Sequence, residues 1–83
     1  FYGKGVELNE KEAFKWYRKA AEQDNAVAQN GVGVCYFYGK GVELNEKEAF
    51  KWYQKAAQQG DEVAQFNLGV CYANCKGAVK DVK

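Results

Sequence analysis

Two stretches of the chain carry the same broad apolar stripe. In each stretch, apolar residues recur at positions i, i+3, i+4, i+7 and i+8, which lie on one face of an α-helix. The stripes consist of Ala13, Trp16, Tyr17, Ala20 and Ala21 and of Ala49, Trp52, Tyr53, Ala56 and Ala57. Asn9 and Asn45 precede the stripes as capping residues, each with a glutamate three positions later. The pattern predicts helices over 9–23 and 45–59, with their aromatic residues in the core.

Two less polar stretches follow these helices, and each also has one continuous apolar face. The faces are formed by Ala28, Val32, Cys35 and Tyr36 and by Ala64, Leu68, Cys71 and Tyr72. They predict helices over 25–38 and 61–74. Gly33 and Gly69 lie in the middle of these helices, where glycine costs about 1 kcal/mol relative to alanine. We therefore expect a neighbouring helix to approach closely at both glycines.

The turns that connect the helices in each pair differ in one important residue. Gly60 stands where a helix commonly ends in a left-handed conformation, and Asp61 can cap the helix that follows. Asp24 stands at the same place in the first turn. Because a non-glycine residue is disfavoured in that conformation, we expect about 1 kcal/mol of backbone strain at Asp24.

The whole pattern repeats with a period of 36 residues. Residues 1–36 and 37–72 are identical at 28 of 36 positions, and residues 73–83 begin a partial third copy. Units of this length stack into solenoids, because one unit cannot bury its apolar face alone. We call the two helices that follow the asparagine caps the B helices and the two less polar ones the A helices. The sequence thus predicts one all-α solenoid segment over 1–83, in the order B-A-B-A, and we expect it to belong to a longer array.

Six residue types are absent from the chain: Ser, Thr, His, Pro, Met and Ile. Without hydroxyl nucleophiles or imidazole, the chain lacks the residues for Ser-His-Asp catalysis, Walker-type phosphate loops and histidine zinc sites. We therefore expect no catalytic, cofactor-binding or metal-binding residues, and no enzyme activity. Apolar runs fall well short of the ~20 residues that a membrane helix needs, so we expect no membrane insertion.

The three cysteines do not have the spacing of a disulfide framework. Cys35 and Cys71 are equivalent in successive copies, two helix spacings of about 8–10 Å apart, beyond the ~7 Å Cα limit for a disulfide. Cys71 and Cys75 lie one helical turn apart, where a disulfide would be strained. We expect Cys35 and Cys71 to be small core residues and Cys75 to be an exposed thiol. The absence of a framework slightly favours the cytoplasm, but the sequence leaves the compartment unknown.

A row of lysines runs along each B helix opposite its apolar stripe. The rows consist of Lys11, Lys15 and Lys19 and of Lys47, Lys51 and Lys55. Such a ridge would suit an anionic polymer, and helical repeats that bind RNA exist. However, the net charge is only +1 and glutamates flank the ridge, whereas nucleic-acid binders usually show a clear basic excess. We therefore expect a solvated convex face and keep nucleic-acid binding as the alternative.

Each A helix carries a second set of residues, which faces away from its own apolar stripe. Ala26, Asn30, Val34 and Phe37 correspond in this set to Glu62, Phe66, Val70 and Ala73. Three of the four pairs differ, so we expect that packing does not fix their identity. Such divergence is typical of a surface that recognises a partner and equally of a surface under no constraint. Apolar residues where solvent is expected favour recognition. We predict that the partner-binding residues are Asn30, Val34, Phe37, Phe66 and Val70.

Together these motifs resemble the Sel-like repeat (SLR) family, tetratricopeptide-related α-solenoids with a unit close to 36 residues. The resemblance covers almost the whole chain and is carried by AQFNLGVCY at 64–72, GKGV at 39–42 and KEAFKWYQKAA at 47–57. Val32 departs from the family pattern at a usual leucine position, and Cys75 replaces the first glycine of the loop. The resemblance implies a superhelix of antiparallel helix pairs that acts as an adaptor in protein complexes, with A helices lining a concave groove and no catalysis.

We therefore predict a protein-protein interaction adaptor, or scaffold, that binds a protein or peptide partner in the groove lined by the A helices. Further repeats of the same longer chain are another candidate partner. Two alternatives stay open: binding of RNA or DNA along the lysine ridge, and a purely architectural spacer.

Overall fold

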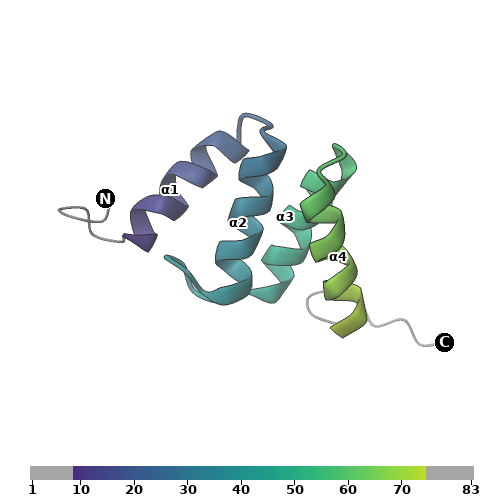
Figure 1. Cartoon of the computed structure of the whole chain (residues 1–83). Coiled ribbons are helices and arrows are strands. Elements are labelled where there is room, and N and C mark those ends of the chain that lie inside the picture. The colour runs from purple at the N-terminus through teal and green to yellow at the C-terminus, as the bar shows by residue number, and fades with distance from the viewer. Residues whose placement is uncertain (1–8, 75–83) are drawn as a thin grey trace, which may run out of the picture.

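The computed structural model describes residues 9–74, which fold into four α-helices (Figure 1). They are α1 (Glu10–Ala21), α2 (Ala26–Tyr38), α3 (Glu46–Gln58) and α4 (Glu62–Asn74). The predicted all-α fold is confirmed, with α1 and α3 as the B helices and α2 and α4 as the A helices. None of the four combines the length and the apolar character that a membrane-spanning helix requires. Most of the partial third copy, including Cys75, lies outside the described residues.

Each helix begins at a side chain that accepts a hydrogen bond from its first turn. In all four cases an asparagine or aspartate oxygen accepts from the backbone N–H three residues later, at 2.9–3.1 Å. The capping residues are Asn9, Asn25, Asn45 and Asp61. Such a cap pairs an N–H group that the helix itself leaves unpaired, so the local sequence determines where each helix begins.

The turns after α1 and α3 have the same backbone conformation although their key residues differ. Asp24 has a φ of 73° and Gly60 a φ of 94°, both in the left-handed region. In each turn, the next residue donates its N–H to a helix carbonyl five positions earlier, at 3.4 Å and 3.2 Å respectively. The predicted left-handed state of Asp24 is thus confirmed, and Asp24 bears a strain that glycine avoids.

The core consists of two buried clusters, and each is completed by residues from the other repeat. The first cluster is Ala21, Ala28 and Val32, and the second is Ala49, Tyr53 and Cys71. Trp52 of α3 packs against the first cluster, while Val34 and Phe37 of α2 pack against the second. Figure 1 accordingly shows α2 beside α3, with α1 and α4 at the two ends. The contact between the repeats is therefore part of the core itself.

The aromatic residues of α1 depart from the sequence prediction, which places both aromatic pairs in the core. Tyr53 is 2% exposed and Trp52 is half-buried, but Trp16 is 58% exposed and Tyr17 is 46% exposed. The reason is that α2 covers α3, whereas no described helix packs on the outer face of α1. The core prediction is therefore confirmed for the second copy and wrong for the first.

The two mid-helix glycines also lie in different environments. A Cβ built on Gly33 would lie 2.6 Å from two ring carbons of Tyr53, so the predicted close approach is confirmed at this position. A Cβ built on Gly69 would have no described atom within 4 Å. Among the described residues, α3 packs so closely on α2 that only glycine fits at position 33. No described helix packs in this way on Gly69 of α4.

Candidate interaction surface

One of the five predicted partner-binding residues, Asn30, lies where α2 and α4 meet, and two others, Phe66 and Val70, lie on α4. Asn30 on α2 is half-buried and accepts a hydrogen bond from the Asn67 side chain of α4 at 3.0 Å. Phe66, the neighbour of Asn67 in the sequence, is 71% exposed. Val70, one helical turn later, is half-buried. The surface along the A helices thus combines a polar contact between repeats with a large exposed aromatic ring.

The other two predicted residues, Val34 and Phe37, contribute to the core between the repeats. Both are half-buried and pack against the cluster around Tyr53. The centroid of the Phe37 ring lies 6.2 Å from that of the Tyr53 ring. The expectation that packing does not fix these two positions is therefore wrong, because the second repeat packs against both. Their role in partner binding stays a prediction.

A hollow of about 480 Å³ opens beside α1 and α2, and its lining is mostly apolar. Its lining consists of Ala13, Tyr17, Val27, Asn30, Gly31, Val34 and Cys35, together with the charged residues Glu10 and Lys40. Asn30 and Val34 thus line one hollow together with residues of α1. The predicted groove lined by the A helices stays a prediction. Sequence reasoning missed Tyr17, because its helical spacing assigns it to the core. Sequence reasoning also missed the exposed Val27. The candidate residues were sought at positions that differ between the copies, and Val27 has the identical counterpart Val63.

The hollow is the open counterpart of a site that is filled in the second repeat. Its lining includes Ala13, Tyr17 and Cys35, which correspond to the cluster of Ala49, Tyr53 and Cys71. There, α2 packs on the cluster, and Ala49 and Tyr53 are 0% and 2% exposed, whereas Ala13 and Tyr17 are exposed. Both Cys35 and Cys71 are buried. The hollow therefore has the composition of a surface that receives the apolar face of a helix.

A glutamine pair, Gln29 and Gln59, provides a partly buried polar contact between the repeats. Gln29 is 1% exposed, donates to the Ala21 carbonyl at 3.2 Å and accepts from the Gln59 side chain at 2.9 Å. Gln65 makes the equivalent donation to the Ala57 carbonyl at 3.2 Å, but it is exposed. Because a buried amide without partners is costly, the pair fixes how one repeat sits on the next.

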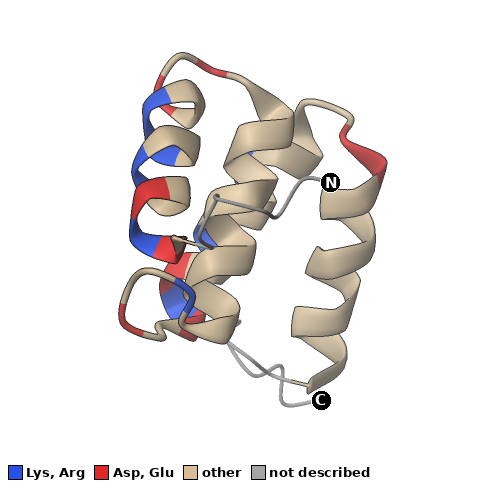
Figure 2. Ribbon diagram, turned by 60° about the vertical axis from the view of Figure 1, so that its left-hand side comes forward, with Lys and Arg blue, Asp and Glu red and all other residues tan. Residues whose placement is uncertain are grey.

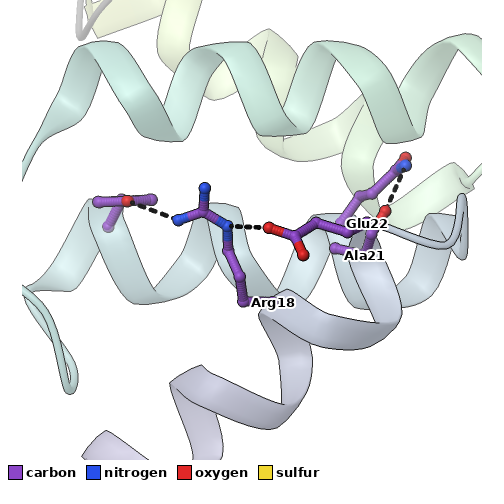
Figure 3. Close-up of polar contacts among 5 residues, drawn as sticks. Arg18, Ala21 and Glu22 are labelled. Atoms are coloured by element: carbon purple, nitrogen blue, oxygen red, sulfur yellow. Dashed lines mark hydrogen bonds and ion pairs between the residues drawn. The ribbon is translucent and has the colours of Figure 1, made fainter.

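Arg18 adds a further contact between the repeats, and it has no equivalent in the other copy, where Gln54 stands. Its side chain donates to Glu22 at 3.1 Å, and Figure 3 shows the guanidinium directed at that carboxylate. It also donates to the Tyr36 hydroxyl at 3.5 Å and lies 5.5 Å from the centroid of the Trp52 ring. The residue thus links α1, α2 and α3, which gives it a structural role.

The lysine ridge is exposed, but acidic and aromatic side chains interrupt it. All six of its lysines are exposed. Lys51 lies 3.7 Å from Glu48, and Lys55 lies 5.4 Å from the centroid of the Trp52 ring. Figure 2 shows basic and acidic segments alternating on the same ribbons. The ridge is therefore a mixed surface, unlike the uniformly basic one that nucleic acids favour.

Cys35 and Cys71 are free, buried thiols, as the sequence predicts. Burial raises the pKa of both thiols above the ordinary value of 9.0, and Glu10 raises that of Cys35 further. Burial likewise raises the pKa of the Tyr53 hydroxyl. A thiol that is buried and neutral is a poor nucleophile and a poor metal ligand. Within residues 9–74, no cluster of three or more Cys, Asp or Glu side chains is able to hold a metal.

Comparison with protein families gives one match, the Sel1 repeat, over residues 1–25, 26–61 and 63–83. The second match begins 25 residues after the first and spans 36 residues, which is the length of one copy. No curated protein sequence matches the chain.

Two solved structures have the same arrangement of helices. One is a Sel1 repeat protein from Oxalobacter formigenes, with 43% identity and a TM-score of 0.87 over 95% of this chain. The other is c5321, a protective antigen present in uropathogenic Escherichia coli strains that displays an SLR fold. It has 37% identity and a TM-score of 0.89, also over 95% of this chain. The chain spans 32% of the length of the first and 17% of the second.

Proposed function

Because this chain belongs to the Sel1 repeat family, whose members are generally protein-interaction scaffolds, we propose that it binds a protein or peptide along its A helices. The observation that carries this proposal is the hollow beside α1 and α2. Its lining repeats the composition of a site that already holds an apolar helix face between α3 and α4. The scaffold acts by binding and needs no catalytic residue.

The chemistry of the surface indicates the class of partner. α2 has no charged residue, and α4 has only Glu62 near its start. Val27, Val63 and Phe66 are each 59–71% exposed along these two helices. An apolar surface of this kind gains by burial at roughly 25 cal/mol per Å². The preferred partner is therefore an amphipathic helix with apolar residues one turn apart, as in Val34 and Phe37.

An architectural spacer is the weaker hypothesis for this chain. A spacer needs only the contacts between repeats, which Gln29, Gln59 and the two clusters already supply. The exposed Phe66 and the open hollow add nothing to such a role, whereas exposed apolar patches commonly mark binding sites.

The proposal is tested with a synthetic peptide that spans residues 25–45 and so carries the α2 face. We expect the peptide to bind the chain in a fluorescence anisotropy titration. Ala13→Gln places a larger polar side chain in the hollow, and Ala13 is exposed, so this variant should fold normally but lose the peptide. Lys47→Gln, an exposed change on another helix, is the matched control. The hollow would be refuted as a helix-binding site if Ala13→Gln bound the peptide as tightly as the wild type. It would also be refuted if the wild type bound no peptide.

A further inference from the structure

One apolar position of the A helices is exposed in both repeats. Val27, in the first turn of α2, is 71% exposed, and its equivalent Val63, in the first turn of α4, is 59% exposed. The helix of Val27 has the second repeat packed on it, and the helix of Val63 has the first repeat in contact with it. Neither a following nor a preceding repeat therefore buries this position, so its exposure does not depend on where the described solenoid begins or ends.

Both valines lie at the same edge of the stack, beside the turns that connect each B helix to its A helix (Figure 1). We call residues 22–27 and 58–63 the turn edge. One helical turn beyond it α2 and α4 meet, because the Asn67 side chain donates to Asn30 at 3.0 Å. The turn edges of the two repeats therefore lie side by side, and each contributes one exposed valine.

The charge of the turn edge is negative. Residues 20–39 and 56–74, which contain both turns and both A helices, include no Lys or Arg. All of their carboxylates lie at the turn edge: Glu22, Asp24, Asp61 and Glu62. Figure 2 shows acidic segments at both turns. Arg18 pairs with Glu22, but every other described Lys or Arg side chain lies on a B helix, apart from Lys40. The exposed valines thus lie among carboxylates.

The differences between the two repeats gather around these valines. Of the eight positions that differ, seven fall between residues 22 and 32 of the first copy. The lysines of the ridge are also exposed, yet they are identical in the two copies. Exposure alone therefore does not account for the differences. Each repeat presents the same valine among different neighbours, as is typical of a surface that recognises a partner.

The number of carboxylates at the turn edge stays the same although their positions change. Four of the differing positions gain or lose a carboxylate. They pair Glu22 with Gln58, Asp24 with Gly60, Asn25 with Asp61 and Ala26 with Glu62. Each repeat nevertheless keeps two carboxylates here. The negative charge is thus common to both repeats, whereas its placement is specific to each.

We propose that the turn edge binds a basic amphipathic helix of another protein. Its apolar residues lie against Val27 and Val63, and its Lys or Arg side chains lie beside the carboxylates. Burial of the valines supplies affinity, and the charges select the partner, because an acidic helix would bring like charges together. This inference rests on the proposed function, because it names the charge of the partner that lies along the A helices.

The test begins with a helical probe peptide of about 14 residues that has Leu on one face and Lys on the other. A matched peptide has Glu in place of each Lys. In fluorescence anisotropy titrations at low salt, we expect the chain to bind the Lys peptide and not the Glu peptide. Added salt should weaken the binding, because it screens exposed charges. Equal affinity for the two peptides, or a preference for the Glu peptide, would overturn the inference.

The apolar contact is tested at Val63, which does not line the hollow. Val63→Gln should weaken binding of the Lys peptide by about tenfold. Leu44→Gln, an exposed apolar change in the loop at the other edge of the stack, should bind like the wild type. Both positions are exposed, so both variants should keep the helical circular dichroism of the wild type. Equal binding by Val63→Gln and Leu44→Gln would place the peptide elsewhere and contradict the inference.

The carboxylates are tested by the double variant Asp24→Asn, Glu62→Gln. It should weaken binding of the Lys peptide by about threefold at low salt. The matched control is Glu12→Gln, Glu43→Gln, which changes the net charge equally at the other edge of the stack and should bind like the wild type. An equal loss in both double variants would reveal a general effect of net charge and would refute the turn edge as the site.

The peptide of residues 25–45 separates this inference from the proposed function. It contains one Lys and one Glu, so its side chains carry no net charge. If it binds the hollow while the Lys peptide fails the tests above, only the basic partner is refuted. If neither peptide binds, both the inference and the proposed function fail.

Discussion

The ring of Tyr53 lies so close to Gly33 that a Cβ on the glycine would approach two ring carbons to 2.6 Å. This contact between α3 and α2 holds the repeats together, and it predicts opposite effects for the same substitution in the two copies. Gly33→Ala should lower the free energy of unfolding by about 1–3 kcal/mol, because overpacking exceeds the gain in helix propensity. Gly69→Ala should raise it by up to about 1 kcal/mol, because the Cβ meets no described atom. Urea melts at concentrations where the chain is monomeric give both values, and equal effects would contradict the account.

Asp24 and Gly60 occupy the same place in the two turns, so exchanging their residue types tests the backbone strain at this place. Replacing Asp24 with glycine should stabilise the chain by about 0.5–1 kcal/mol, because the left-handed φ of 73° no longer strains a Cβ. The weak contact from Gln29 to the Asp24 carboxylate, at 3.5 Å, is lost and reduces the gain only slightly. Gly60→Asp should destabilise by a similar amount. Urea melts again provide the measurement, and a destabilised Asp24→Gly variant would show that the carboxylate contributes more than the strain costs.

The buried thiols predict how stability depends on alkaline pH. Burial raises the pKa of Cys35 and of Cys71 in the folded state, whereas the unfolded thiols ionise near the ordinary value of 9.0. The folded state therefore binds more protons above that pH, so the free energy of unfolding should fall as the pH rises past 9.0. Urea melts at neutral pH and at about pH 10 measure the fall. The double variant Cys35→Ala, Cys71→Ala should show a smaller fall, and an unchanged one would exclude the thiols as its cause.

The lysine ridge predicts little affinity for nucleic acid. Lys51 and Lys55 lie close to Glu48 and Trp52, and the chain as a whole carries a net charge of only +1. We expect no measurable binding of RNA or DNA at physiological salt. Any binding at low salt should weaken steeply as salt is added, because each neutralised phosphate releases counterions. Micromolar binding at physiological salt, abolished when Lys15, Lys19, Lys51 and Lys55 are changed to Glu, would favour the nucleic-acid alternative instead.

Substitutions of Phe66 and Tyr53 should distinguish an effect on partner binding from an effect on folding. Phe66 is 71% exposed, so Phe66→Ala should change the free energy of unfolding by well under 1 kcal/mol, but weaken partner binding by more than about 1 kcal/mol. Tyr53 is 2% exposed, so Tyr53→Ala should cost about 3–5 kcal/mol through the cavity that it leaves. Urea melts measure the effects on stability, and titration with a partner of the A helices measures the effect on binding. The α2-face peptide does not serve for this measurement, because Phe66 does not line the hollow. If Phe66→Ala destabilises the fold as much as Tyr53→Ala does, Phe66 belongs to the core between repeats.

The sequence by itself determines the local features of this protein, because they depend on residues close together in the chain. The caps at Asn9 and Asn45 and the apolar periodicity predict the helices, which the structure shows within two residues of the predicted ends. The position of Asp24 in the repeat likewise predicts its left-handed backbone. The period of 36 residues predicts the solenoid, because a unit of this kind has to stack on a neighbour.

Only the tertiary structure decides which copy of a repeated residue is buried. Tyr17 and Tyr53 end identical stretches, residues 9–17 and 45–53, yet one is half exposed and the other is enclosed. Gly33 and Gly69 differ in the same way. Burial depends on the helix that packs from the adjacent repeat, and this helix is present at the middle of the described solenoid but not at its ends. The exposure of a residue is therefore defined by its position in the stack, which a repeated sequence does not distinguish.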